Sequence, residues 1–258
     1  MGLINVYKTK NSKVRYIKSN LYDDTNSEYL VRYKEGTLPN DDAHNCQAGA
    51  NAICFMRKNL IALVARVKQD RCNGGKECNV HEDGSNKLEK DALTHIKQEE
   101  IEMLIDRFNP DNISESTPDD KYTSYSVNKG EKIIFCIREK VNGKNPHEII
   151  DINTLMFVAI HELAHVMTKS IGHGDDFWNN MRYLLSVAVR TPAPTNYQGK
   201  GNDYKGNSFY TNNIAVNSKW LEQKNIYYYV NYAEDGASAA YCGTNISTTP
   251  CKNDKCTP

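Results

Sequence analysis

The chain has 258 residues, and its 32 Lys and Arg residues balance 32 Asp and Glu residues to a formal net charge of +0. A chain of this length can bury a sizeable core, and zero net charge excludes a global field that would draw it to nucleic acid or to an anionic membrane. The mean hydropathy is -0.67. The one long apolar run, residues 149–171, is interrupted by Asp151, His161, Glu162 and His165, so it predicts a buried helix and no membrane span.

The first part of the chain predicts one strand and one long helix. Residues 1–27 are polar and irregular, and we expect a polar N-terminal extension there. Alternation in SEYLVRY predicts a strand over residues 28–33. Over residues 41–69 apolar residues recur at helical spacing after Asp41 and Asp42, either of which can cap a helix. The opening sequence MGLINVYKTK lacks an apolar signal segment, so we expect an intracellular protein.

An exposed insertion and a second helix are expected next. Residues 72–87 carry many charges, Gly-containing turns and no periodicity, which is typical of an exposed insertion. A helix is predicted over residues 88–108, because apolar residues return to helical spacing and Pro110 ends the pattern. The stretch YTSYSVNKGEKIIFCIRE then predicts a β-hairpin whose turn, Asn128-Lys129-Gly130, offers Gly for a positive φ.

Two further helices follow the hairpin. The third is capped by Asp151 or Asn153 and runs to Ser170, with Gly172 placed to end it in the left-handed conformation. The fourth is predicted over residues 175–189 from its apolar spacing.

These elements predict an α+β fold. We expect one domain over residues 28–190, which includes the exposed insertion. Residues 191–219 are rich in Gly, Asn, Ser, Thr and Tyr and predict a long loop, so we expect residues 191–258 to be a loop-rich C-terminal extension that packs on the same domain. Within it we expect a short extended segment, IYYYVNY, and a final loop or tail, YCGTNISTTPCKNDKCTP.

The eight cysteines are scattered along the chain, and we expect most of them to be reduced thiols. Cys54 and Cys136 lie in apolar patterns and are interpreted as small core residues. Cys72, Cys78 and His81 are candidates for a second metal site or a loop disulfide. Their spacing in the sequence matches no zinc-binding motif.

The sequence HELAH, residues 161–165, predicts a metal site on the third helix. Residues four apart lie on one face of a helix, so His161 and His165 present two imidazoles to one point. The Glu162 carboxylate projects beside that point and can accept a proton from water at the metal. Two histidines on a solvated face are the alternative. The apolar residues around them leave little solvated face, and burying such polar groups without a partner costs on the order of a few kcal/mol per group.

A catalytic zinc site needs a third protein ligand. His173 lies just past Gly172, where the chain can turn back toward the first two histidines. The spacing is longer than that of metzincins, and the first downstream glutamate is Glu222. Asp175 and Asp176 are alternative ligands, or partners that orient a histidine.

HELAH followed by His173-Gly174-Asp175-Asp176-Phe177 resembles the WLM and SprT-like zinc metallopeptidases, whose third ligand is the histidine of that second motif. Together with YLVRY, RFNPDNISE, YTSYSVNKGEKIIFCIR and YCGT, the pattern is most similar to the WLM-type metallopeptidases of large nucleocytoplasmic DNA viruses. This similarity covers roughly residues 28–251. The segments at residues 72–86 and 193–220 are longer in this chain than the family pattern requires. The resemblance implies a zincin-like domain of minimal gluzincin type, in which the H-E-x-x-H helix packs on a small β-sheet or hairpin with additional helices.

The resemblance also implies a function. One Zn²⁺ per chain would be held by His161, His165 and His173, and Glu162 would act as the base in hydrolysis of peptide bonds of protein substrates. Cellular relatives act on proteins crosslinked to DNA, so DNA and DNA-bound proteins are expected partners. A viral protein of this kind would be found in the host cytoplasm or nucleus, or in the virion.

Substrate contacts are a further expectation. The strand over residues 132–138 is expected at the sheet edge beside the cleft, where Ile133, Ile134 and Phe135 would bind an extended substrate. A tyrosine among residues 210, 227, 228 and 229 is expected to stabilise the oxyanion.

Two other functions are open. The metal site can be structural in a virion or assembly protein with capsid or assembly partners, and a closed fourth ligand would favour that role. The second alternative function is nucleic-acid binding. It is supported by the basic run from Lys8 to Lys18 and by tyrosines, which can stack on bases.

Overall fold

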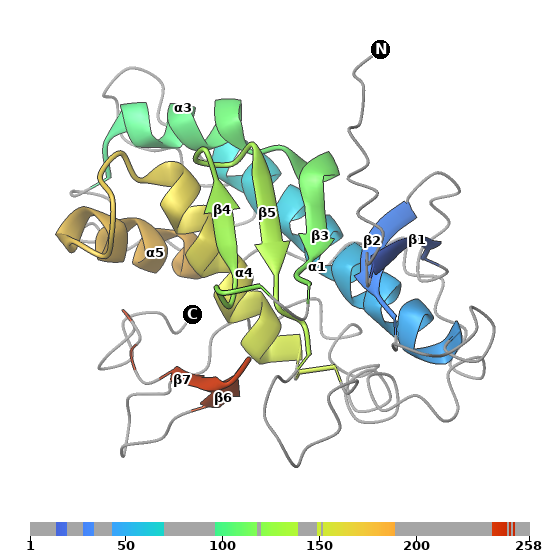
Figure 1. The fold of residues 1–258 in the computed structure, drawn as a ribbon. Helices are drawn as coiled ribbons and strands as arrows, with labels where there is room; N and C mark the ends of the chain where they lie inside the picture. The colour runs from blue at the N-terminus through green and yellow to red at the C-terminus, as the bar shows by residue number, and fades with distance from the viewer. Residues whose placement is uncertain are drawn as a thin grey trace.

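The computed structural model describes residues 14–19, 28–33, 43–69, 96–117, 120–138, 149–150, 152–188, 239–246, 248 and 250. These residues form a mixed α+β fold, as the sequence predicts (Figure 1). Helices α1 and α4 pack on a small three-stranded sheet, and two two-stranded sheets flank this core. The predicted division into an extension, a domain and a C-terminal extension stays a prediction.

The N-terminal sheet is an antiparallel pair. Strand β1, Val14–Lys18, pairs with β2, Glu28–Arg32, so that Val14 lies opposite Arg32. The strand predicted over residues 28–33 is confirmed. The prediction that residues 1–27 are irregular is wrong for β1, because the short run VRYIK pairs with the neighbouring β2 although it shows no clear apolar alternation of its own.

Helix α1, Ala43–Gln69, supplies one wall of the core, and it agrees with the helix predicted over residues 41–69. Helix α3, Gln98–Arg107, begins later than predicted. Residues 88–95 of the predicted helix lie outside the described residues, and Ile96 and Lys97 are not helical. The Lys97 N–H donates to Glu100 Oε2 at 3.2 Å, so the Glu100 side chain caps the helix at this point.

The three-stranded sheet has the order β3-β5-β4. Strand β3, Ile113–Glu115, runs parallel to β5, Lys132–Phe135, and follows a single 3₁₀ turn, η1, Pro110–Asn112. Strand β4, Tyr125–Val127, pairs antiparallel with β5 and confirms the predicted hairpin.

The position of β5 corrects the sequence analysis, which expected this strand at the sheet edge. It is the central strand of the sheet, because β3, a segment too short to give a period-two pattern, pairs with its other side. Ile133, Ile134 and Phe135 are buried in the core. The strand at the edge of this sheet beside α4 is β4.

Helices α4 and α5 follow the sheet. Helix α4, Ile152–Met167, is apolar on most of its surface and packs against α1, α3, α5 and β4, as expected of a helix that is largely buried. It ends three residues before the predicted end at Ser170, and Gly172 has the expected positive φ of 91°. Helix α5, Asp175–Ala188, matches the prediction within one residue.

A disulfide joins the C-terminal hairpin to the central sheet. Strands β6, Ala239–Tyr241, and β7, Thr244–Ile246, pair antiparallel where the sequence analysis expected a loop or tail. Cys242, in the turn of this hairpin, forms a disulfide with Cys136, which directly follows β5. Cys136 is buried in the core as predicted, but the expectation of a reduced thiol is wrong for it, because a partner 106 residues away in the sequence is not visible in the local pattern. Cys54 is fully buried in the core, as predicted.

A buried ion pair fixes the β3 end of the sheet. Arg138 Nε donates to Glu115 Oε1 at 2.8 Å, and the Arg32 backbone N–H donates to Glu115 Oε2 at 2.7 Å. Gly49 of α1 lies against this pair, and a Cβ at that position would stand 2.5 Å from Arg138 Nη2. The absence of a side chain at residue 49 therefore lets α1 approach the ion pair.

In the described part of the chain, no helix combines the length and the apolar character that a membrane crossing requires.

Candidate metal centre

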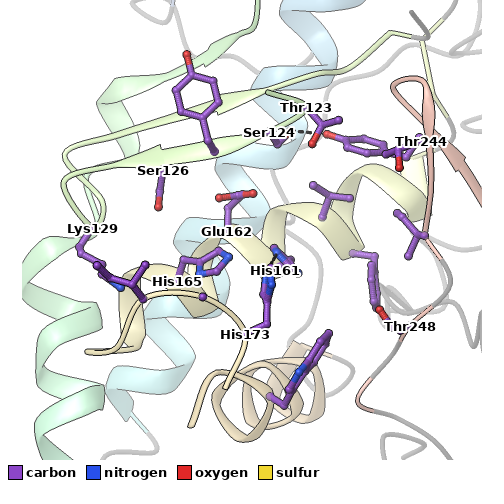
Figure 2. Close-up of a pocket in the computed structure, with 18 of the residues that line it drawn as sticks. Thr123, Ser124, Ser126, Lys129, His161, Glu162, His165, His173, Thr244 and Thr248 are labelled. Carbon is purple, nitrogen blue, oxygen red and sulfur yellow. Dashed lines mark hydrogen bonds between the residues drawn. The ribbon is translucent and has the colours of Figure 1, made fainter. Parts of the chain in front are cut away.

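Three histidine side chains converge at one end of a pocket. His161 and His165 lie one turn apart on α4, and His173 comes from the segment between α4 and α5 (Figure 2). The centroids of the three rings are 4.9 Å apart in every pairing. Their candidate ligand atoms all lie within 4.8 Å of one another. The structure thus brings together the three metal ligands proposed from the sequence.

The spacing of one pair of nitrogen atoms fits a tetrahedral metal ion. His173 Nε2 lies 3.1 Å from His161 Nε2. Two imidazole nitrogens at the usual Zn–N distance on one tetrahedral ion are about 3.3 Å apart. The two atoms therefore already stand at nearly the separation that a shared zinc ion requires, and the residues present fit that ion.

The first turn of α5 positions His173. The centroid of the Phe177 ring lies 4.8, 4.4 and 4.6 Å from the ring centroids of His161, His165 and His173, respectively. Phe177 is fully buried, and the Trp178 ring lies 5.9 Å from that of His173. The motif His173-Gly174-Asp175-Asp176-Phe177 thus has a physical basis, since its last residue packs against all three imidazoles.

The environment of the histidines favours neutral imidazole, the form that binds metal. Burial, together with the neighbouring His165 and His173, lowers the pKa of His161 to about 3. Burial, His173 and Lys129 lower the pKa of His165 to about 4. Two of the three nitrogen donors are therefore deprotonated in the folded protein at neutral pH.

Glu162 is the acidic group of the pocket. Its side chain is directed into the same pocket as the histidines, and the residue is only 4% exposed (Figure 2). Burial raises the pKa of Glu162 more than a hydrogen bond from the Ser126 backbone of β4 lowers it, and the resulting pKa is about 8. In the metal-free protein this carboxyl group therefore keeps its proton near neutral pH.

The pocket has a volume of about 740 Å³. The hairpin turn and β4 border the pocket on one side, and α4 forms its floor. The β6–β7 hairpin, residues 171–173 and Trp178 also border it. The β-hairpin side and the β6–β7 hairpin are joined by the Cys136–Cys242 disulfide and by a hydrogen bond between Ser124 Oγ and the Tyr241 hydroxyl. The wall residues are mainly hydroxyl, amide and apolar side chains: Thr123, Ser124, Ser126, Asn128, Tyr241, Thr244, Asn245, Ile246 and Thr248.

The other residues singled out from the sequence lie elsewhere. Ile133, Ile134 and Phe135 do not line this pocket, and the neighbouring β4 takes that place. Asp176 lies next to the histidine segment and accepts from Ser170 Oγ at 2.5 Å, but it is not among the three clustered ligands. Several candidates lie outside the described residues. They are the tyrosines at 210, 227, 228 and 229, Glu222, and the cluster of Cys72, Cys78 and His81.

Sequence reasoning missed two parts of the pocket. Lys129 was interpreted as a turn residue only, although it lines the pocket beside His165. The β6–β7 wall was missed because its strands have three residues each. The Cys242-Gly243 pair was the available signal, since both residues have the positive φ that a two-residue hairpin turn requires.

Comparison with known proteins identifies viral relatives. The chain is 36% identical over 182 residues to the uncharacterized protein R325 of Acanthamoeba polyphaga mimivirus, which covers 70% of this chain and 74% of that protein. It is 41% identical over 81 residues to the uncharacterized protein 042R of Invertebrate iridescent virus 3, which covers 29% of this chain and 48% of the relative. It is 30% identical over 95 residues to the uncharacterized protein 136R of Invertebrate iridescent virus 6, which covers 36% of this chain and 52% of the relative.

No solved structure matches the chain significantly. The family model of the WLM domain matches residues 76–251, a segment that contains the sheet, α4, α5, the three histidines and the C-terminal hairpin. The protein belongs to the WLM domain family.

Proposed function

We propose that this protein is a zinc-dependent metallopeptidase with a zincin-like active site. The observation that carries the proposal is the convergence of three imidazoles beside a buried glutamate in one open pocket. Membership of the WLM family supports it, since that family is associated with zinc metallopeptidases.

The proposed ligands of one Zn²⁺ per chain are His161, His165 and His173. Among the described residues three side chains form this group, which is the number of protein ligands typical of a catalytic zinc site. A zinc ion held there would supply Lewis acidity, which polarises a carbonyl group and acidifies water. This donor set does not favour a purely structural site, which usually has four protein ligands.

Glu162 is proposed as the general base. It follows the first ligand on α4, so its carboxylate lies beside the imidazoles and faces the pocket. A bound cation would favour the ionised carboxylate, in opposition to the burial that raises its pKa. The ionised Glu162 would take a proton from the attacking water and return it to the departing amine.

Strand β4 is proposed to bind the substrate backbone. It is the edge strand of its sheet beside the pocket, and an extended peptide can add to such an edge through main-chain hydrogen bonds. Ser126 lies on this strand, and its backbone N–H reaches Glu162, so the edge that would pair with a peptide faces the proposed base. This replaces β5 as the proposed substrate strand.

The physiological substrate is proposed to be a protein, and DNA-bound proteins are one class to test. The test is zinc content together with cleavage of casein and of histone, with and without DNA, for wild type, Glu162→Gln and the exposed control Glu99→Gln. The proposal expects about one zinc per chain in all three proteins and cleavage by wild type and Glu99→Gln only. Zinc in all three without cleavage by any would favour a structural metal in a virion or assembly protein.

A further inference from the structure

The segment that carries His173 is exposed yet must be placed accurately. Residues 169–174 are all exposed, and Ile171 is 94% exposed. Within this segment His173 Nε2 nevertheless reaches to 3.1 Å from His161 Nε2. Apolar burial of residues 169–174 cannot hold the segment in place, so other contacts must do so.

Lys129 makes two of those contacts. Its Nζ donates to Thr168 O at 2.9 Å and to Ser170 O at 2.6 Å. These carbonyls lie just beyond the end of α4, where the helix leaves backbone acceptors without helical partners and where its dipole favours a positive charge. The Lys129 ammonium group therefore closes the C-terminal end of α4 and fixes the first residues of the His173 segment.

The backbone at Lys129 is held in an unusual conformation. Asn128, Lys129 and Gly130 have φ values of 47°, 56° and 114°, and a positive φ is uncommon for a lysine. Gly130 is seated against neighbouring elements, since a Cβ there would lie 2.7 Å from Arg107 O and 2.9 Å from Val166 Cγ1. The turn is thus fixed between α3 and α4, and this fixed turn directs Lys129 toward the His173 segment.

Helices α4 and α5 make further contacts with the segment, in addition to the Phe177 and Trp178 rings that pack against His173. Thr168 Oγ1 donates to Ala164 O at 2.7 Å and accepts from Asn180 Nδ2 at 3.0 Å. Ser170 Oγ donates to Asp176 Oδ2. Lys129 comes from the β-hairpin, so it connects the wall that carries β4 with the segment that carries the third histidine.

We propose that Lys129 is a positioning residue that holds the segment 168–174 so that His173 completes the metal site. The inference rests on the proposed metal site. It assigns a role beyond that site, because Lys129 is not a ligand and its cationic group would act through two backbone carbonyls. The hairpin that borders the substrate cleft would thereby also set the geometry of the third ligand.

A purely electrostatic role and a positioning role of Lys129 predict opposite effects of its removal on zinc binding. A cation near a dication repels it, and the charge of Lys129 already lowers the pKa of His165. If Lys129 acted only through its charge, Lys129→Met would bind zinc as tightly as wild type or more tightly. If it positions His173, the same substitution weakens zinc binding, on the scale of about 10–100-fold found when groups that orient metal ligands are removed.

The test measures the zinc dissociation constant by competition with a chromophoric chelator for wild type, Lys129→Met, Lys129→Arg and Lys169→Met. Lys169 is exposed and lies on the segment itself, so Lys169→Met removes the same charge nearby and serves as the matched control. We expect weaker binding for Lys129→Met, partial recovery with Lys129→Arg, which retains charged donors, and no weakening for Lys169→Met. Unchanged or tighter zinc binding by Lys129→Met would overturn the proposal.

Hydrogen exchange of the metal-free proteins provides a second readout. Positioning predicts faster exchange in Lys129→Met at residues 168–174, with α4 and α5 unchanged, whereas faster exchange throughout both helices would show general destabilisation and reject the positioning role. If wild type binds no zinc, the proposed function fails, and the exchange measurement still decides whether Lys129 holds the segment.

Discussion

His173 Nε2 lies 3.1 Å from His161 Nε2, although the two residues are on different elements and twelve positions apart. The first prediction follows from this distance. His173→Ala should weaken zinc binding by more than about 100-fold, beyond the effect usual for groups that only orient a ligand. Asp175→Asn, in the same motif, should bind zinc like wild type. Equal affinities of wild type and His173→Ala, measured by chelator competition, would remove His173 from the ligand set.

The second prediction concerns the pH dependence of folding stability in the metal-free protein. The pKa of Glu162 is raised from 4.5 to about 8, so between these values the folded chain keeps a proton that the unfolded chain has lost. The contribution of this group to stability is therefore fully present below about pH 4.5 and is lost as the pH rises toward 8.

Glutamine at residue 162 has no proton to lose. Glu162→Gln should therefore be more stable than wild type by an amount that grows between about pH 5 and about pH 8, reaching on the order of 1–3 kcal/mol. Thermal unfolding of both proteins in the presence of a chelator measures the difference. A difference that does not change with pH would contradict the raised pKa.

The third prediction tests the buried ion pair between Glu115 and Arg138 at the β3 end of the sheet. Glu115→Gln removes the charge that faces Arg138, and both side chains are almost completely buried. Breaking such a pair leaves an uncompensated buried cation, so the free energy of unfolding should fall by roughly 3–5 kcal/mol. Glu99→Gln makes the same chemical change on an exposed surface and should alter stability by less than about 0.5 kcal/mol. Denaturant unfolding distinguishes the two, and equal stabilities would show that the pair contributes little.

The fourth prediction concerns the Cys136–Cys242 disulfide. Because it closes a long loop of chain, its removal in Cys242→Ser should lower the free energy of unfolding by about 2–4 kcal/mol. A reductant should lower the melting temperature of wild type and have a much smaller effect on Cys242→Ser. Peptide mapping by mass spectrometry without reduction should recover the crosslinked pair, and its absence from folded, air-oxidised protein would refute the bond.

The fifth prediction tests pairing of the substrate with β4. Once a cleaved peptide has been identified, single N-methylation of its amides should reduce kcat/KM strongly at alternate positions, since successive N–H groups of a strand point to opposite sides. Amides that face away from β4 should tolerate the change and are the internal control. A peptide that tolerates methylation at every position near the cleaved bond would exclude strand addition.

The helices and the histidine cluster were predictable from the sequence because they rest on local spacing. His161 and His165 are one helical turn apart, and Gly172 permits the turn that brings His173 back to them. Helix α5 was predicted within one residue for the same reason, since its apolar residues repeat at helical intervals.

The sheets were predicted less well because their partners are distant in the sequence. The place of β5 in the middle of its sheet depends on β3, which has three residues and gives no periodic pattern. The partner of Cys136 lies 106 residues away, and spacing alone does not choose among eight cysteines. Lys129 was missed as a pocket residue because its importance comes from carbonyls on another element.

The Cys136–Cys242 bond makes the intervening chain a covalent ring that contains both α4 and α5, and with them all three histidines and Glu162. A single cut in the backbone of that ring would leave both fragments joined through sulfur. If the protein cleaves itself there, a non-reducing gel would show a chain of unchanged mass, and the fragments would separate only after reduction. The cut molecule would still carry the complete set of metal-site side chains.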